Sequence, residues 1–142
     1  EIESTESCLH ENVGMVRSML SSLRNQGVRV SLDDFGTGYS SLEQLRSLPF
    51  DRLKIDRSFV RDIPDDKDDT EIAATIIAMA KNLRLSVVAE GVETEAQLQF
   101  LKENGCDDVQ GYLISRPIDA EAFTTLLEQS QPARDLLDTL GR

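Results

Sequence analysis

The hydrophobic positions in the first third of the chain predict a helix, a strand and a second, shorter helix. Apolar residues recur at spacings of three and four across Glu11–Gln26, which is typical of an amphipathic helix that ends at Gly27. The next run, Val28–Leu32, is short and rich in β-branched residues, so it predicts a strand. Leucines spaced by three then predict a short helix over Leu42–Leu48, which Pro49 ends.

The rest of the chain repeats this alternation of strand and helix. A broad apolar face predicts a long helix over Thr70–Leu85, and the polar segment before it, Pro64–Asp69, predicts a solvated loop. Thr94, with Gln97 three residues later and Gly105 past the end, predicts a capped helix. The remaining predictions are strands at Leu53–Ile55, Ser86–Glu93 and Asp107–Ser115, a helical turn at Asp56–Val60, a helix at Asp119–Gln129, and a surface helix or frayed tail over Ser130–Arg142.

The alternation predicts an α/β fold. Strand and helix alternate about four times with short connections, which favours parallel strands joined by right-handed crossovers. A complete (β/α)₈ barrel typically needs about 250 residues. The 142 residues of this chain, in about four β/α units, therefore correspond to roughly half of such a barrel.

Composition and charge exclude several classes of function. The net charge of −11 predicts that the surface repels long nucleic acids. A single histidine, His10, leaves almost no material for histidine-rich metal sites or for Ser-His-Asp catalysis. Two distant cysteines, Cys8 and Cys106, indicate free thiols in a reducing compartment. With no bilayer-length apolar segment and no signal-peptide pattern, we expect no membrane contact from this segment and a cytoplasmic location.

Each predicted strand carries polar residues at its carboxyl end: Asp33 and Asp34, Lys54 and Asp56, Glu90, and Gln110. In parallel α/β folds this edge of the sheet holds ligands and catalytic groups. Carboxylates that converge there repel one another by several kcal/mol at about 4 Å, and divalent cations would relieve that repulsion. Oxygen ligands favour Mg²⁺ or Mn²⁺, and Ca²⁺ can also occupy such a site.

The carboxylates and Lys54 also have a purely structural interpretation. The Asp33–Asp34 pair could end a strand and cap the next turn, with Gly36 and Gly38 permitting a turn of the backbone. Lys54 could form a core ion pair instead of orienting a water or a phosphate. Glu90 and Glu93 could cap the helix that begins after Thr94. The "DFG" tripeptide lacks the other motifs of protein kinases, and "GTG" lacks the third glycine of a dinucleotide fingerprint.

Four motifs together resemble the EAL domain family of bacterial cyclic di-GMP phosphodiesterases. They are "ESTES" at Glu3–Ser7, "DDFGTGYSSL" at Asp33–Leu42, "KIDRSFV" at Lys54–Val60, and "AEGVET" at Ala89–Thr94 followed by "QGYLISRP" at Gln110–Pro117. The resemblance implies the C-terminal part of a TIM-like (β/α)₈ barrel. It also implies hydrolysis of a phosphodiester bond of cyclic di-GMP to linear pGpG.

The resemblance assigns a role to each matching residue. It implies that Glu3, Asp33 and Asp34 are metal ligands, with Asp33 bridging two Mg²⁺ or Mn²⁺ ions, and that Ca²⁺ binds without productive turnover. Glu90 would bind metal or metal-bound water, Lys54 would contact the nucleophilic water or the phosphate, and Gln110 would support the water network. The residues implied to support the loop and the substrate are Glu6, Gly36, Thr37, Gly38 and Glu93.

The sequence departs from the family pattern in one respect. The Glu-Ala-Leu signature and a ligating asparagine belong upstream of Glu3 and are missing, so we expect this segment alone to be inactive. We expect residues 1–130 to form the C-terminal portion of the domain and 131–142 a tail. The expected partners are cyclic di-GMP, the upstream half of the barrel, a second copy in a homodimer, and sensory or GGDEF domains. The alternatives are a degenerate cyclic di-GMP receptor and a regulatory or dimerisation module.

Overall fold

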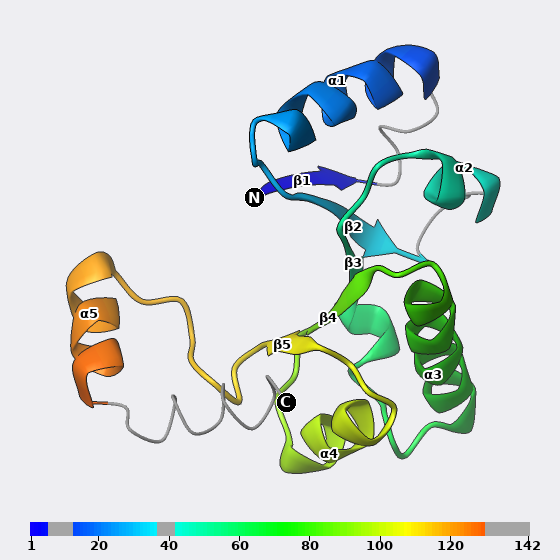
Figure 1. The fold of residues 1–142 in the computed structure, drawn as a ribbon. Coiled ribbons are helices and arrows are strands. Elements are labelled where there is room, and N and C mark those ends of the chain that lie inside the picture. The colour runs from blue at the N-terminus through cyan, green and yellow to red at the C-terminus, as the bar shows by residue number, and fades with distance from the viewer. Residues whose placement is uncertain (6–12, 37–41, 130–142) are drawn as a thin grey trace.

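The strands form one parallel sheet in the order in which they occur along the chain (Figure 1). The computed structural model describes residues 1–5, 13–36 and 42–129. Within them the sheet has the order β1-β2-β3-β4-β5, and every neighbouring pair is parallel. The strands are β1 Ile2–Thr5, β2 Val30–Phe35, β3 Arg52–Ile55, β4 Ser86–Glu90 and β5 Asp108–Gln110.

All the described helices except the last one, α5, cover one face of this sheet, and this packing forms the core. The helices are α1 Val13–Asn25, α2 Leu42–Ser47, the 3₁₀ helix η2 Arg57–Phe59, α3 Lys67–Asn82, α4 Glu95–Glu103 and α5 Ala120–Gln129. Buried residues of α1 to α4, such as Leu20, Leu45, Ile77 and Leu101, join one cluster with the strands. Among the described residues, no helix is both long and apolar enough to cross a bilayer.

The two faces of the sheet have opposite character. Side chains of a strand alternate between faces, and the alternate positions Leu32, Leu53 and Val87 are fully buried in the core under the helices. The positions between them form the opposite face, which we call the polar face. Its residues are Ser31, Asp33, Arg52, Lys54, Ser86, Val88, Glu90, Asp108 and Gln110, together with Glu1 and Glu3 at the first strand. These charged and polar side chains therefore lie on the face opposite the helical core.

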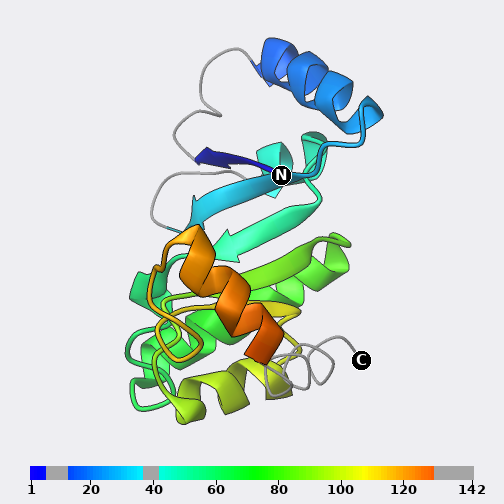
Figure 2. The ribbon, with the colours of Figure 1, turned by 90° about the vertical axis from the view of Figure 1, so that its left-hand side faces the viewer.

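Helix α5 lies apart from the helices that cover the core face. Figures 1 and 2 show it on the other side of the sheet from α3. Its residue Phe123 is half exposed, as is Ile118 just before the helix. The sequence correctly predicts this helix, but not its position.

The largest differences between the predicted and the observed elements concern β1, α3 and β5, while β2 runs on to Phe35 instead of ending at Leu32 and β4 ends at Glu90 instead of Glu93. The first strand, β1, was not predicted, and it makes the sheet five-stranded. Helix α3 begins at Lys67, inside the segment predicted as a solvated loop, because the Asp66 carboxylate caps it by accepting a hydrogen bond from the Asp69 N–H at 3.0 Å. Strand β5 has only three residues, whereas the sequence predicts a strand over Asp107–Ser115; after Gly111 the chain turns, with the Ile114 N–H bonded to the Gly111 carbonyl at 3.1 Å.

Candidate metal centre

A bulge in β2 turns both aspartates of the Asp33–Asp34 pair toward the same strand. Leu32 pairs with Leu53 and Phe35 pairs with Ile55, so two residues of β2 oppose the single residue Lys54 of β3. Asp34 adopts the left-handed conformation, with φ of 55°. Aspartate is one of the few residues other than glycine that adopts this conformation readily. The turn required by two adjacent aspartates is therefore made at Asp34 itself.

Three carboxylates converge at the end of β2 and β4. Oxygen atoms of Asp33, Asp34 and Glu90 all lie within 4.8 Å of one another, and each residue is half-buried. Glu90 ends β4, where it is in register with Gln110 of β5. The carboxyl ends of β2 and β4 thus supply a cluster of oxygen donors, as the sequence predicts.

Lys54 joins this cluster to a fourth carboxylate. Its Nζ atom lies 2.7 Å from Glu90 Oε1, 3.0 Å from Asp33 Oδ1 and 2.8 Å from Glu3 Oε1. Lys54 is 7% exposed, and although burial acts to lower its pKa, the hydrogen bonds to Glu3, Glu90 and Asp33 outweigh it and raise the pKa. Lys54 is therefore a fully charged cation with carboxylates on three sides.

The charges in this cluster do not balance. Glu3, Asp33, Asp34 and Glu90 contribute four carboxylates, and Lys54 is the cation that contacts three of them. Partial burial, followed by repulsion from Asp33 and Asp56, raises the pKa of Asp34. An excess of closely spaced oxygen donors fits a hard divalent cation, which would offset this repulsion. The residues present therefore suit Mg²⁺, Mn²⁺ or Ca²⁺.

Two glycines beside the cluster let side chains of η2 pack closely against it. Gly36 follows the bulge with φ of 100°, and a Cβ atom there would lie 2.7 Å from the Phe59 ring. Gly91 follows Glu90 with φ of 71°, and a Cβ atom there would lie 2.6 Å from Arg57 Cβ. Both contacts are with η2, so the "KIDRSFV" motif packs against the ends of β2 and β4.

Asp56 fixes the start of that short helix. Its carboxylate caps η2 and accepts hydrogen bonds from the Ser58 N–H and hydroxyl. Burial acts to raise the pKa of Asp56, but these hydrogen bonds outweigh it and lower the pKa. Asp56 therefore supports η2 as an ionised capping residue.

The other predicted site residues fall into two groups. Gln110 is exposed at the end of β5, and Glu93 is exposed before α4, where its N–H donates to Gln97 Oε1 at 2.7 Å. Glu6, Thr37 and Gly38 lie outside the described residues. The structure thus brings together Glu3, Asp33, Asp34, Lys54 and Glu90, with Gln110 beside Glu90 in the register. Sequence reasoning missed the contacts of Phe59 and Arg57 with the glycines, although both residues belong to a motif that it identified.

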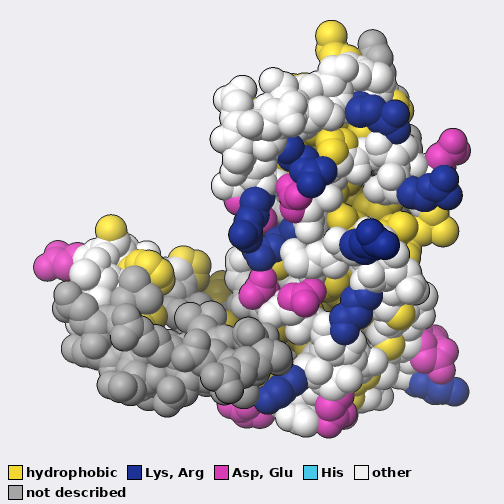
Figure 3. Space-filling model, in the orientation of Figure 1, with side chains coloured by type: hydrophobic (Ala, Val, Ile, Leu, Met, Phe, Trp, Pro, Cys, Tyr) yellow, Lys and Arg dark blue, Asp and Glu magenta, His cyan; other side chains and the backbone are white. Residues whose placement is uncertain are grey.

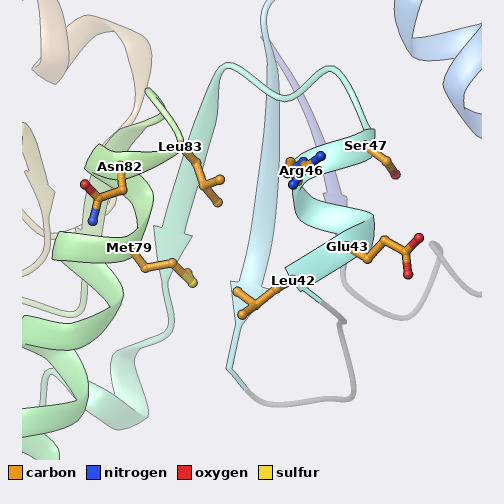
Figure 4. Close-up of a pocket in the computed structure, with 7 residues that line it drawn as sticks. All are labelled: Leu42, Glu43, Arg46, Ser47, Met79, Asn82 and Leu83. Atoms are coloured by element: carbon orange, nitrogen blue, oxygen red, sulfur yellow. The ribbon is translucent and has the colours of Figure 1, made fainter.

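A separate recess lies between α2 and α3, on the core side of the sheet. Leu42 of α2, Met79 of α3 and Leu83 just after α3 line it (Figure 4). Apolar side chains gather on the surface in this region, among separate Lys, Arg, Asp and Glu side chains (Figure 3). The clustered carboxylates and Lys54 do not line this recess, so it is not the candidate metal centre.

Comparison with known proteins identifies the family. The family model described as EAL domain matches residues 1–117. The chain belongs to the EAL domain family. It is 57% identical to the cyclic di-GMP phosphodiesterase NbdA of Pseudomonas aeruginosa over 127 residues. This match covers 89% of the chain and 16% of NbdA. The chain thus spans less than a fifth of that relative's length.

Solved structures of EAL proteins share the fold. A PaMucR phosphodiesterase in complex with c-di-GMP matches with a TM-score of 0.80 and 47% identity, over 85% of this chain and 49% of that one. Klebsiella pneumoniae BlrP1, solved as a manganese/cy-diGMP complex, matches with a TM-score of 0.74 and 38% identity, over 82% of this chain and 30% of that one. The EAL neighbours are TIM barrels of which this chain covers a part, so the five-stranded sheet is part of such a barrel and the predicted fold class is confirmed.

Proposed function

We propose that the intact EAL domain containing this chain hydrolyses one phosphodiester bond of cyclic di-GMP to give linear pGpG. The observation that supports this most strongly is the convergence of Asp33, Asp34 and Glu90 oxygens within 4.8 Å, beside the Lys54 ammonium. The named activity of NbdA and the nucleotide bound to PaMucR support cyclic di-GMP as the substrate.

Glu3, Asp33, Asp34 and Glu90 would hold divalent cations, for which Mg²⁺ and Mn²⁺ are the productive candidates. BlrP1 has been solved with manganese and with calcium alongside cy-diGMP, which supports a divalent site in this family. When bound, such cations stabilise charge on the attacking and leaving oxygens of a phosphodiester. The acid cluster of this chain has the oxygen donors needed to bind them.

Lys54 and the residues at the strand ends would align the reactants. The Lys54 ammonium can donate a hydrogen bond to a phosphate oxygen or to the attacking water, once cations relieve its carboxylate neighbours. Glu90 and Gln110, in register on β4 and β5, can accept hydrogen bonds from that water and orient it. Gly36 and Gly91 keep the turns beside these groups tight enough for η2 to support them.

The activity is assigned to the intact domain. This chain covers 49% of the PaMucR chain, and we propose that the segment alone lacks turnover. We also propose that the domain extends through α5 to residue 130. The full-length protein would form a homodimer and contain further signalling domains, as MucR is named a bifunctional diguanylate cyclase and phosphodiesterase.

Hydrolysis of cyclic di-GMP by the intact domain with Mn²⁺, followed as pGpG by chromatography, tests this proposal. Asp34→Asn should lower the rate at least about 100-fold, because it removes a ligand charge while asparagine tolerates the same backbone conformation. Asp65→Asn, at an exposed loop acid, is the matched control and should leave the rate unchanged. Tight binding of cyclic di-GMP without product would contradict hydrolysis and favour a receptor.

A further inference from the structure

A second polar network lies on the same face of the sheet as the acid cluster, one layer nearer the amino ends of the strands. We call this direction below the cluster. Arg52 is two residues before Lys54 on β3, so both side chains lie on the polar face. Its Nη2 atom lies 2.7 Å from Asp108 Oδ2, its Nε atom donates to Ser86 Oγ at 3.2 Å, and its Nη1 atom lies 3.4 Å from Glu1 Oε2. One guanidinium on β3 therefore contacts side chains from β4, from β5 and from the residue that precedes β1.

The two carboxylates that Arg52 contacts each lie two residues before a candidate site residue, just as Arg52 lies two residues before Lys54. Glu1 is two residues before Glu3, and Asp108 is two residues before Gln110. Since side chains two apart along extended chain share a face, Asp108 lies one layer below Gln110 on β5, and Glu1, just before β1, lies one layer below Glu3. The acid cluster above shows the same arrangement, because Lys54 on β3 contacts Glu3 of β1 across β2, as Arg52 contacts Glu1.

The strand between β1 and β3 has a small side chain at this level. Ser31 of β2 is in register with both Glu3 and Arg52. It is fully buried, and its hydroxyl has no hydrogen-bond partner among the described residues. A larger residue here would stand between β1 and β3 on the polar face, in the path by which Arg52 reaches Glu1.

We propose that Arg52 is a positioning residue for the metal and phosphodiester site. Its guanidinium links the strands of Glu3, Lys54 and Gln110 and so sets how far each of these side chains extends into the site. The planar, fixed fork of arginine suits this task, because it can bond several strands at once with defined directions. A ligand misplaced by about 1 Å costs a large factor in rate, so a rigid layer below the site has a direct functional effect. This inference rests on the proposed function, because the site that Arg52 positions is the one described there.

The test measures Mn²⁺ affinity of the intact domain by calorimetry, with urea unfolding run in parallel. Arg52→Met keeps the aliphatic stem and removes the fork, and it should weaken Mn²⁺ binding about tenfold. Arg52→Lys should restore part of the affinity, because an ammonium can bond one partner but not all three. Arg24→Met is the matched control. It removes an ion pair that lies outside the polar face, between Arg24 and Asp51 at 3.0 Å, and it should leave the Mn²⁺ affinity within about twofold of the wild-type value.

Each outcome decides the inference. Wild-type Mn²⁺ affinity in Arg52→Met, even with lowered unfolding stability, would show that Arg52 is merely structural and would overturn it. If Arg52→Met does not fold, Asp108→Asn takes its place and should weaken Mn²⁺ binding about threefold, whereas wild-type affinity would again overturn the inference. A wild-type domain that binds Mn²⁺ but produces no pGpG would refute the proposed function alone. A wild-type domain that binds no Mn²⁺ would refute both.

Discussion

At the scale of single residues, the candidate site depends on one unusual backbone conformation and one buried cation. Asp34, at φ of 55°, lets the bulge bring two consecutive carboxylates into one cluster with Glu90, beside Lys54. Lys54 then contacts Glu3, Asp33 and Glu90 at 2.7–3.0 Å. When no metal ion is bound, the Lys54 ammonium holds together carboxylates that would otherwise repel one another.

Replacing Lys54 by methionine should therefore destabilise the metal-free protein. Removing the Lys54 ammonium leaves the carboxylates without their partner. Because solvent screens the half-exposed Glu3, we expect only a moderate loss of about 1–3 kcal/mol in unfolding free energy. Added Mn²⁺ should restore part of this loss. Urea unfolding with and without Mn²⁺ measures both effects.

The matched control for this change is Lys67→Met. Lys67 pairs with Glu71 at 3.7 Å on an exposed helix surface, so its loss should cost less than about 0.5 kcal/mol and should not respond to Mn²⁺. If Lys54→Met behaved like Lys67→Met, the ion pairs of Lys54 would not hold the cluster together.

A second residue-scale prediction concerns Cys106, whose thiol is buried two residues before β5. Burial raises the pKa of Cys106 from its ordinary value of 9.0 to about 12. Because the folded-state pKa is the higher one, this contribution to stability is complete below about pH 9. It is lost as the pH rises toward about 12, by up to about 1.4 kcal/mol per pH unit.

Comparison with Cys106→Ala isolates this effect from the titration of lysines and tyrosines. Between pH 9 and about 10.5 the wild-type protein should lose unfolding free energy faster than the variant, although the variant is less stable at neutral pH. Parallel pH profiles for the two proteins would contradict the raised pKa of Cys106.

At the scale of elements, helix α4 shows how a short motif fixes a helix beside the site. The capping box predicted from Thr94 and Gln97 is confirmed, with both reciprocal hydrogen bonds present. Gln97 is buried, and its side chain also donates to the Arg61 carbonyl at 2.9 Å. This side chain therefore links the start of α4 to the segment that follows η2.

Gln97→Ala should lower the unfolding free energy by about 1–3 kcal/mol, because it leaves the Glu93 and Thr94 N–H groups and the Arg61 carbonyl without this partner. Gln99→Ala on the exposed side of the same helix is the control and should change it by less than about 0.5 kcal/mol. Urea denaturation gives both values, and equal effects would show that the buried cap does not stabilise α4.

The elements that the sequence predicts well are those with long periodic patterns. Helices α1 and α3 were predicted because their apolar residues repeat over three or more turns. Helix α4 is shorter and was predicted from its end signals, Thr94 with Gln97 at the start and Gly105 past the end. The start of α3 was missed because a run of acids indicates a solvated loop, although acids near a helix N-terminus favour the helix dipole. Strand β1 was missed because its four residues, Ile-Glu-Ser-Thr, show no apolar run and obtain their order from pairing with β2.

At the scale of the whole molecule, the chain is a five-stranded part of a barrel with a helical core face and a polar face. The sequence correctly predicted which strand ends come together, because the carboxyl ends of parallel strands meet at one edge. It could not predict the bulge at Asp34 or the Arg52 network, since both depend on register between strands distant in sequence. These two features fix where the predicted residues stand within the site.

The most direct test of the central claim is the anomalous diffraction of Mn²⁺ in crystals of the intact domain. The account predicts a manganese peak within about 2.0–2.3 Å of oxygens from Asp33, Asp34 and Glu90, with Lys54 Nζ withdrawn from at least one of its carboxylates. Crystals of a domain that hydrolyses cyclic di-GMP, but that show no manganese at these oxygens and retain all three Lys54 ion pairs, would contradict it.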